Sequence, residues 1–597
     1  MKTTRHALPL LLLCTAALFG CAHTERAELP QASKTGPTAT GPAPEDSASP
    51  PREETVQAQR EPEAAPEYPV RSFPVETLYD LMVAEMAGIQ NDLHLALNNY
   101  LIQARTTRDP GIVARAARIA AYAENHPALL EMALLWTEVE PDNLDARSVA
   151  ALSLGREGRL LEALPHAEYA LSEGDQEPLM TLAVTAGGAS PEQRQALLDQ
   201  YPQLLQRLPE DETVMLTRAM LLRQQGELKP ALTAVESLLQ EAPEKESAIM
   251  LKAQLLHQLS RKQEATRFLS DSLQNIADSK RLRLQYARFL AEDDLEGAYQ
   301  QLTTLTEQYP RDPELAYTLA LVCKGLDRHE EARQLFTQLS YNPNMAASAH
   351  YELGLLAEAR GDTEAVLMHY RQVRNGPKFL PAAVRLSKFM ARHGQIDNAR
   401  LYLNKLRAEH PQFSAPLYQI ESELLVDHRR LEDAHLLLSE ALEEFPDNIS
   451  LLYNRSMLSE QQDDFASSEQ DLRAILAQDA DNATALNALG YTLTVHTNRY
   501  EEAHQLILRA LELNPGDPAI IDSLGWVLFQ LGEHEAAIRH LREALTKMPD
   551  PEIAAHLGEA LWTTGQREEA HKVWKGILER YPDSPVVLET MERLQAN

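Results

Sequence analysis

Two consecutive stretches near the C-terminal end decide the fold of this chain. They read PAIIDSLGWVLFQLGEHEAAIRHLREALTKMP at 518–549 and PEIAAHLGEALWTTGQREEAHKVWKGILERYP at 551–582. When the two are aligned, the same residues recur at an interval of 33: Leu524-Gly525 with Leu557-Gly558, Gly532 with Gly565, Ala537 with Ala570, and Pro549 with Pro582. Matching residues at one fixed interval indicate an internal repeat.

Each matched residue has a physical reason within a pair of helices. A Gly in the first helix and an Ala in the second let two helices cross closely. The Gly between them provides a turn, and the final Pro stops the second helix. The pattern resembles the tetratricopeptide repeat (TPR), which implies an all-α solenoid of helix-turn-helix units coiled into a right-handed superhelix.

Extending the frame backwards from Gly558 in steps of 33 to 35 residues gives fifteen candidate repeats. The small-residue position of the first helix then falls at 84, 117, 151, 185, 219, 253, 286, 320, 354, 387, 422, 456, 490, 525 and 558. Twelve residues later the chain has Ala at 96, 163, 231, 265, 298, 332, 399, 434, 537 and 570, and at 503 after a one-residue insertion near Asn498. We therefore predict a TPR solenoid over 75–597, clearest over 483–582. Gly187-Gly188 predicts a shortened helix or a bend in the unit around Thr185.

Composition agrees with packed helices and excludes some classes of partner. Of the 597 residues, 44% are apolar and only 6% aromatic. The net charge of −32 argues against nucleic acid as the main partner, since phosphate binding needs a basic surface. Of the three cysteines, only Cys323 lies in the repeats, where it takes a core position. We expect it to be buried and inert.

The N-terminal end has the features of a bacterial lipoprotein leader. Lys2 and Arg5 precede an apolar run from Leu8 to Phe19 that is too short to span a bilayer. The run ends in Leu18-Phe19-Gly20-Cys21, which resembles the lipobox. The resemblance implies a signal peptide over 1–20, lipidation of Cys21, and, because Ala22 follows the cysteine, an outer membrane anchor facing the periplasm. The alternative is an ordinary cleaved secretory signal.

The segment 21–74 differs in composition from the repeats. Ten prolines and many Glu, Ser, Thr and Ala residues replace the large apolar residues there. Such a segment cannot bury enough surface to offset the entropy of ordering. We expect a disordered tether between the anchor and the solenoid.

Catalytic patterns are missing from the repeats. His534-Glu535 and His329-Glu330 begin like a zinc-protease motif, but Ile538 and Arg333 stand where the second His is needed. We expect no catalytic residue, no metal site and no cofactor. The sequence thus predicts a binding protein and not an enzyme.

The first helices of the C-terminal repeats are the predicted partner-binding face. In a TPR superhelix these helices line the concave surface, and aromatic anchors often carry binding energy there. The candidate residues are Asn487, Tyr491, Asp522, Trp526, Phe529, Glu559 and Trp562. Trp526 and Trp562 either anchor a partner or fill gaps between repeats, whereas Trp574 is expected in the core.

The runs NALGYTL (487–493), DSLGW (522–526) and HLGEALW (556–562), after a lipobox and a Pro-rich segment, resemble the TPR outer-membrane lipoproteins of pseudomonads. The resemblance implies a noncatalytic periplasmic adaptor. Its partners would be a carboxyl-terminal processing protease and the protease's substrates, peptidoglycan hydrolases. The alternative is a scaffold for assembly of an envelope machine: a pilotin, an exopolysaccharide-export lipoprotein or an outer-membrane insertion factor.

Overall fold

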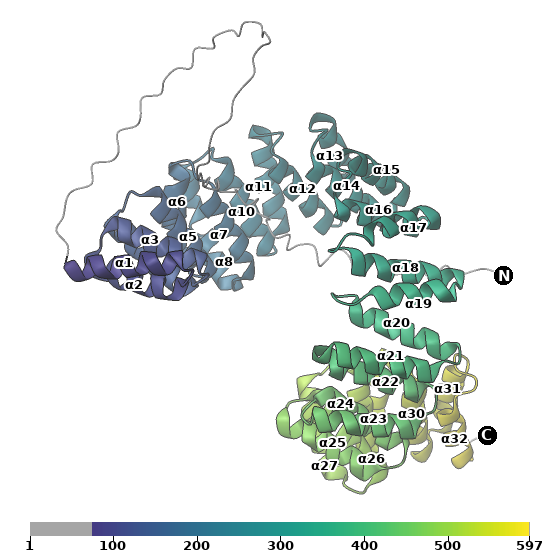
Figure 1. Cartoon of the computed structure of the whole chain (residues 1–597). Coiled ribbons are helices and arrows are strands. Elements are labelled where there is room, and N and C mark those ends of the chain that lie inside the picture. The colour runs from purple at the N-terminus through teal and green to yellow at the C-terminus, as the bar shows by residue number, and fades with distance from the viewer. Residues whose placement is uncertain (1–73, 596–597) are drawn as a thin grey trace, which may run out of the picture. The chain divides into compact units, whose positions relative to one another are not determined.

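The computed structural model describes residues 74–595, and within that range every regular element is a helix. The predicted signal peptide (1–20), the lipidation site Cys21 and the tether as far as residue 73 lie outside the described residues. Successive helices lie side by side along the chain, from α1 to α32 (Figure 1). The described residues therefore form an all-α solenoid, as the repeat pattern predicts.

The helices come in pairs, and each pair packs on the next. The first helices of the pairs are α1 (Val75–Ile89), α3 (Pro110–Tyr122), α5 (Leu144–Arg156), α7 (Glu177–Thr185), α10 (Glu212–Gln224), α12 (Glu246–Gln258), α14 (Lys280–Asp293), α16 (Pro313–Gly325), α18 (Ala346–Arg360), α20 (Phe379–Arg392), α22 (Ser414–Asp427), α24 (Ile449–Gln461), α26 (Ala483–His496), α28 (Pro518–Gln530) and α30 (Pro551–Thr563). Each of the fifteen small-residue positions of the repeat frame lies in one of these first helices.

The second helices complete the pairs, and α32 (Pro585–Arg593) follows the last pair. They are α2 (Leu93–Thr107), α4 (His126–Val139), α6 (Leu160–Ser172), α8 (Pro191–Leu198) with α9 (Tyr201–Arg207), α11 (Leu228–Glu241), α13 (Lys262–Asn275), α15 (Leu295–Gln308), α17 (His329–Leu339), α19 (Thr363–Gln372), α21 (Ile396–Glu409), α23 (Leu431–Glu444), α25 (Phe465–Gln478), α27 (Tyr500–Leu513), α29 (His534–Lys547) and α31 (Arg567–Leu578). The alanine expected twelve residues after the small position is buried in all eleven repeats that have it.

Many first helices begin at an Asp, Asn or Ser whose side chain accepts a hydrogen bond from the first turn. Such N-caps satisfy backbone N–H groups that have no partner within the helix. The N-caps of this kind are Asp109, Asn143, Asp211, Ser279, Asp312, Asn448, Asn482, Asp517 and Asp550. They recur at the repeat interval, so helix starts are encoded locally in each unit.

The turn inside most pairs places one residue in the left-handed region of the backbone. Six of these residues are glycines: Gly158, Gly226, Gly361, Gly394, Gly532 and Gly565. Six others are not: Asn91, Glu124, Ser260, Asp327, Arg429 and Asp463. The turn geometry is therefore kept even where the glycine signal is absent from the sequence.

The glycines of the first helices make room for large side chains of the second helices. A Cβ on Gly558 would overlap the indole of Trp574, and one on Gly525 would lie 2.6 Å from Cγ of Leu541. Trp574 is fully buried, as the repeat frame predicts. Close crossing of the two helices thus depends on the missing side chain.

The unit around Thr185 is irregular, as Gly187-Gly188 predicts. Helix α7 ends at Thr185 and continues as a short 3-10 helix, η2 (Ala186–Gly188). Ser190 then starts α8 with a capping box, in which Ser190 and Gln193 exchange side-chain and backbone hydrogen bonds. A second short 3-10 helix, η3 (Pro411–Phe413), precedes α22. The chain therefore accommodates local breaks without leaving the repeat frame.

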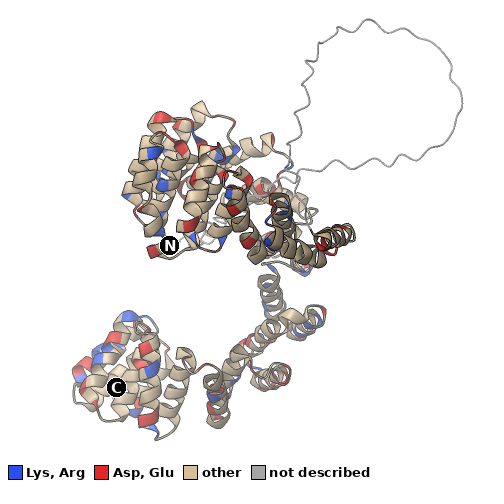
Figure 2. Ribbon diagram, turned by 90° about the vertical axis from the view of Figure 1, so that its left-hand side faces the viewer, with Lys and Arg blue, Asp and Glu red and all other residues tan. Residues whose placement is uncertain are grey.

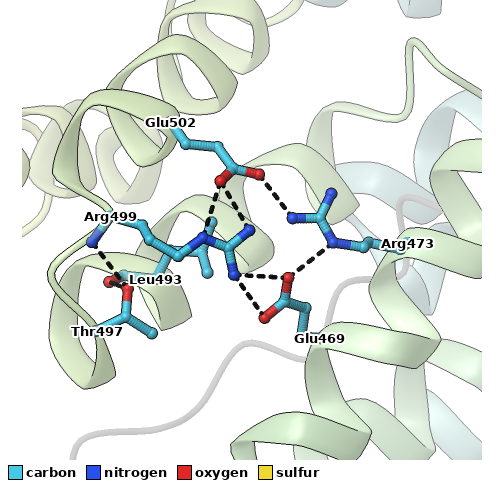
Figure 3. Close-up of polar contacts among 6 residues, drawn as sticks. All are labelled: Glu469, Arg473, Leu493, Thr497, Arg499 and Glu502. Atoms are coloured by element: carbon cyan, nitrogen blue, oxygen red, sulfur yellow. Dashed lines mark hydrogen bonds and ion pairs between the residues drawn. The ribbon is translucent and has the colours of Figure 1, made fainter.

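The extra residue between α26 and α27 lies in a loop held by a ring of ion pairs (Figure 3). Arg499, the residue before α27, pairs with Glu469 of α25 at 2.9 Å and with Glu502 of α27 at 2.7 Å. Arg473 closes the ring by pairing with the same two carboxylates. The backbone N–H of Arg499 also donates to Thr497 Oγ1 at 3.1 Å. These contacts fix a turn that has no left-handed residue.

Candidate functional site

The predicted partner-binding residues lie on three successive first helices, α26, α28 and α30. Tyr491, Trp526 and Glu559 each follow the small-residue position directly, so they occupy the same place in three repeats. Because equivalent positions of stacked units face the same way, these side chains form one line along the first helices. The repeat thus builds a continuous surface from residues far apart in the sequence.

Asp522 is buried, although the sequence predicts it on the exposed partner-binding face. Only 5% of its surface is accessible, because α28 and α30 pack side by side and enclose it. Its two carboxylate oxygens lie 3.0 and 3.2 Å from Nδ1 of His556 on α30. An ionised carboxylate can only accept, so the imidazole donates. Asp522 therefore ties α28 to α30 and does not reach solvent.

His556 is a buried charge partner that the sequence did not predict. Burial alone lowers its pKa, but the Asp522 carboxylate and its hydrogen bond outweigh burial, and the net shift is upward. The imidazole also stacks on the indole of Trp526, with ring centroids 4.2 Å apart and an interplanar angle of 16°. Protonated His556 thus joins the acidic and aromatic parts of the surface.

Aromatic rings and carboxylates surround the pair of Asp522 and His556. Trp526 stacks on Phe529 with centroids 5.2 Å apart. The Tyr491 hydroxyl donates to Glu552 of α30, and burial followed by the Glu552 charge raises the pKa of Tyr491 well above its ordinary value. Trp526, Phe529 and Tyr491 are all half-buried. Neighbouring repeats cover part of each ring.

Two acceptors at the edge of the cluster retain hydrogen-bonding capacity. Asn487 of α26 is half-buried, and its Oδ1 has no hydrogen-bond partner within residues 74–595. Burial, with a smaller effect from the nearby Glu552, raises the pKa of Glu460 on α24. The Glu460 carboxylate accepts one long hydrogen bond, 3.4 Å, from Thr492 and lies 3.6 Å from Nε2 of His496. An N–H or cation of a partner would satisfy both groups.

The other two predicted residues are also held by neighbours. Glu559 accepts two hydrogen bonds from Arg593 of α32, at 2.8 and 2.5 Å, and is half-buried. Trp562 lies under the guanidinium of Arg567 at 4.8 Å and edge-on to His571 at 5.3 Å. It is half-buried beside the buried Trp574. The helix α32 thus covers the end of the predicted face.

Cys323 and the histidines show no arrangement suited to chemistry in the described part of the chain. Burial raises the pKa of the Cys323 thiol to about 11, which keeps it protonated and unreactive. Among the described residues, no group of three His, Cys, Asp or Glu side chains could hold a metal ion. His534 and His329, which begin the two incomplete zinc motifs, are the first residues of α29 and α17.

Comparison with known proteins assigns the repeat family. Two models described as tetratricopeptide repeat match residues 453–518 and 528–594. The chain is also 41% identical over 503 residues to the TPR repeat-containing protein PA4667 of Pseudomonas aeruginosa, covering 84% of each chain. The chain belongs to the tetratricopeptide repeat family. Its repeats therefore form a scaffold for protein interaction.

Solved TPR structures resemble parts of the chain more distantly. A TPR protein of Thermus thermophilus is 22% identical, with a TM-score of 0.27 over 29% of this chain and 94% of its own. One of Parabacteroides merdae is 17% identical, with a TM-score of 0.34 over 42% of this chain and all of its own. At these TM-scores neither adds to the assignment.

The helices of the repeats also differ from membrane spans. Within residues 74–595, none combines the length and apolar character needed to cross a bilayer.

Proposed function

We propose that this TPR chain is a noncatalytic adaptor of the periplasm, held at the outer membrane by a lipid on Cys21. It recruits a carboxyl-terminal processing protease and brings it together with its substrates, the peptidoglycan hydrolases. The observation that supports this most is the unbroken series of helix pairs from α1 to α31. A long scaffold with many equivalent faces can hold two proteins at once and so raise their effective concentration.

The cluster on α26, α28 and α30 supplies a surface for one of these partners. Its half-buried rings Tyr491, Trp526 and Phe529 are fixed by stacking and hydrogen bonds, which lowers the entropy lost on binding. Aromatic residues in such positions are typical hot spots of protein interfaces. Asn487 and Glu460 add acceptors beside them.

The test is degradation of a purified peptidoglycan hydrolase by the purified protease, with and without the full chain. We expect faster degradation when the chain is present. The variant Phe529→Ala should weaken this effect, whereas Tyr341→Ala, which removes an 83% exposed ring elsewhere, should not. A degradation rate that is the same with and without the chain would exclude the adaptor function.

A capture experiment from envelope extract separates the proposal from the assembly scaffold. Recovery of the protease and cell-wall hydrolases supports the adaptor, whereas recovery of secretin or barrel subunits supports assembly. The lipid anchor is tested separately with Cys21→Ser, which should move the protein from the membrane fraction to the soluble periplasmic fraction. Unchanged fractionation would exclude anchoring through Cys21.

A further inference from the structure

One segment of this acidic chain is strongly basic. Residues 371–407 hold nine Lys or Arg and a single acidic residue, Asp397, which gives a local charge of +8 in a chain of net charge −32. The segment runs from the end of α19 through α20 into α21. The described helices as a whole carry both acidic and basic residues (Figure 2).

The cations of α20 line a groove against α22. The groove has a volume of about 430 Å³ and lies between these two first helices. Its lining consists of Val384, Arg385, Lys388, Arg392, Leu424, Asp427 and His428. The three α20 cations follow one another at intervals of three and four residues, so they share one face of the helix. The groove therefore combines apolar and cationic side chains with one carboxylate, Asp427, and one imidazole, His428.

The groove occupies the same face of the repeat as the C-terminal cluster. Lys388 directly follows the small-residue position Ser387, as Trp526 follows Gly525. In a TPR solenoid, this is the face of the first helices that faces away from the second helices. A partner lying along the first helices would therefore meet both features.

The charges of the groove are only partly neutralised. Arg385 pairs with Glu358 of α18 at 3.0 Å, but Lys388 approaches Asp427 only to 4.0 Å. Arg392 makes no ion pair with any described residue, and its Nε donates to the Lys388 carbonyl at 3.3 Å. Two of the three cations thus remain able to bind a carboxylate.

Two other basic residues of the segment behave differently. Arg400 and Arg407 of α21 both pair with Glu421 of α22, whose side chain is only 2% exposed. Both positive charges are paired with this buried carboxylate. Arg400 and Arg407 are therefore less available to a ligand than Lys388 and Arg392.

We propose that the groove between α20 and α22 binds an acidic peptide segment of a partner protein. Carboxylates of the segment bind Lys388 and Arg392, and an apolar side chain of the same segment packs on Val384 and Leu424. Complementary charge selects the partner and speeds its encounter with the chain. A few cations in one short groove fit a peptide better than the long phosphate backbone of a nucleic acid. The net charge of −32 opposes an anionic membrane surface.

The test measures binding of a short fluorescein-labelled peptide of alternating Glu and Leu to the full chain. A Lys and Leu peptide of equal length is the control for charge. We expect the Glu peptide to bind, the Lys peptide not to bind, and the affinity of the Glu peptide to fall with added salt. The double variant K388E/R392E should raise the Kd of the Glu peptide at least about tenfold.

A matched variant controls for the change in net charge. K572E/R539E reverses two exposed cations on α31 and α29 and should leave the Kd unchanged. The milder K388Q/R392Q should give an intermediate Kd, and helical circular dichroism of each variant checks folding. An unchanged Kd in a folded K388E/R392E variant would overturn the proposal.

Two further probes distinguish other anionic ligands. Binding of phosphatidylglycerol vesicles and of a single-stranded oligonucleotide to the chain is measured directly. If either one binds in a manner that depends on Lys388 and Arg392 while the Glu peptide does not bind, the peptide proposal is wrong. The inference goes beyond the adaptor function and can be tested apart from it. Peptide binding without any effect on proteolysis would support the groove as a peptide site and exclude recruitment of the protease.

Discussion

The glycines of the first helices act through the side chain they lack. Gly558 lies against the buried indole of Trp574, and a methyl group added at Gly558 would overlap that ring. Gly558→Ala should therefore lower the free energy of unfolding of the last pair by about 1–3 kcal/mol, the usual cost of overpacking a core. Native-state hydrogen exchange of α30 and α31 measures the loss.

Gly576 provides the control within the same pair. It lies inside α31, and a Cβ there would meet nothing within 4 Å. Gly576→Ala should stabilise the pair by about 0.5–1 kcal/mol, because Ala favours a helix interior. Equal effects of the two substitutions would refute the role assigned to Gly558.

The turn residue Glu124 carries a different kind of strain. Its φ of 53° places a side chain in the left-handed region, which costs about 1 kcal/mol for a residue other than glycine. Glu124→Gly should raise the stability of α3 and α4 by about 0.5 kcal/mol, because the extra freedom of unfolded glycine offsets part of the gain. In the next repeat, Glu157 has a φ of −80°, so Glu157→Gly should destabilise its pair instead. Native-state hydrogen exchange should therefore become slower in α3 and α4 of Glu124→Gly and faster in α5 and α6 of Glu157→Gly.

At the scale of the helix, the ion pairs of Glu421 join α21 to α22. The carboxylate accepts from Arg400 at 2.9 Å and from Arg407 at 2.7 Å, and it is almost completely buried. Glu421→Ala leaves two guanidinium groups without their partner, so these helices should lose about 3 kcal/mol of stability. The exposed neighbour Glu423 serves as control, and Glu423→Ala should change stability by less than about 0.5 kcal/mol. An equally small loss of stability in Glu421→Ala would contradict the role of the Glu421 ion pairs in joining α21 to α22.

The contact between α28 and α30 should depend on pH. The pKa of His556 is raised in the folded chain, chiefly through Asp522, so protonation stabilises the folded form. That stabilisation is complete below the ordinary histidine pKa of about 6.5 and is lost as pH rises through the folded value. Hydrogen exchange of α28 and α30, corrected for intrinsic rates, should therefore become faster at alkaline pH. Each tenfold increase in the corrected rate corresponds to about 1.4 kcal/mol of lost stability.

The variant Asp522→Asn separates this effect from other titrations. The charged groups facing His556 are Asp522, Glu552 and Glu559. Removing the Asp522 charge should flatten the pH dependence of the α28 and α30 exchange. A dependence as steep as that of the unsubstituted chain would assign the effect to another group.

Helix pairs were predictable from sequence because small residues at close crossings leave a strong signal. Ala537 and Ala570 are buried where the repeat frame places them, and so is Trp574. Exposure of the candidate site was not predictable, since it depends on what the next repeat contributes. Asp522 is buried where α28 packs against α30 and His556 stands opposite, and predicting this requires knowing how the two helices meet.

Two further features were not predicted, for different reasons. Half of the left-handed turns lack glycine, because the cost for another residue is small enough for the rest of the pair to outweigh. The groove of α20 and α22 does not show in the total charge of the chain. A running count of charge along the sequence would have found the basic segment 371–407.

At the scale of the whole chain, stability should be a sum of local terms. Each pair contacts mainly the pairs before and after it, as in other repeat proteins. Glu421→Ala and Gly558→Ala lie in pairs that do not touch, so their effects should add within about 0.5 kcal/mol in the double variant. Exchange of each region should report only its own substitution. Coupling of several kcal/mol would mean that the chain unfolds as one unit.

The ring of Arg473, Arg499, Glu469 and Glu502 has a practical consequence for engineering the chain. It holds the turn between α26 and α27, where the repeat carries an additional residue, through Arg499 at the end of that turn (Figure 3). These ion pairs join the start of α27 to α25 through side chains. A reporter peptide inserted before Arg499 would therefore lie beside ion pairs that hold α27 in place, and it would leave every residue of the predicted binding face unchanged.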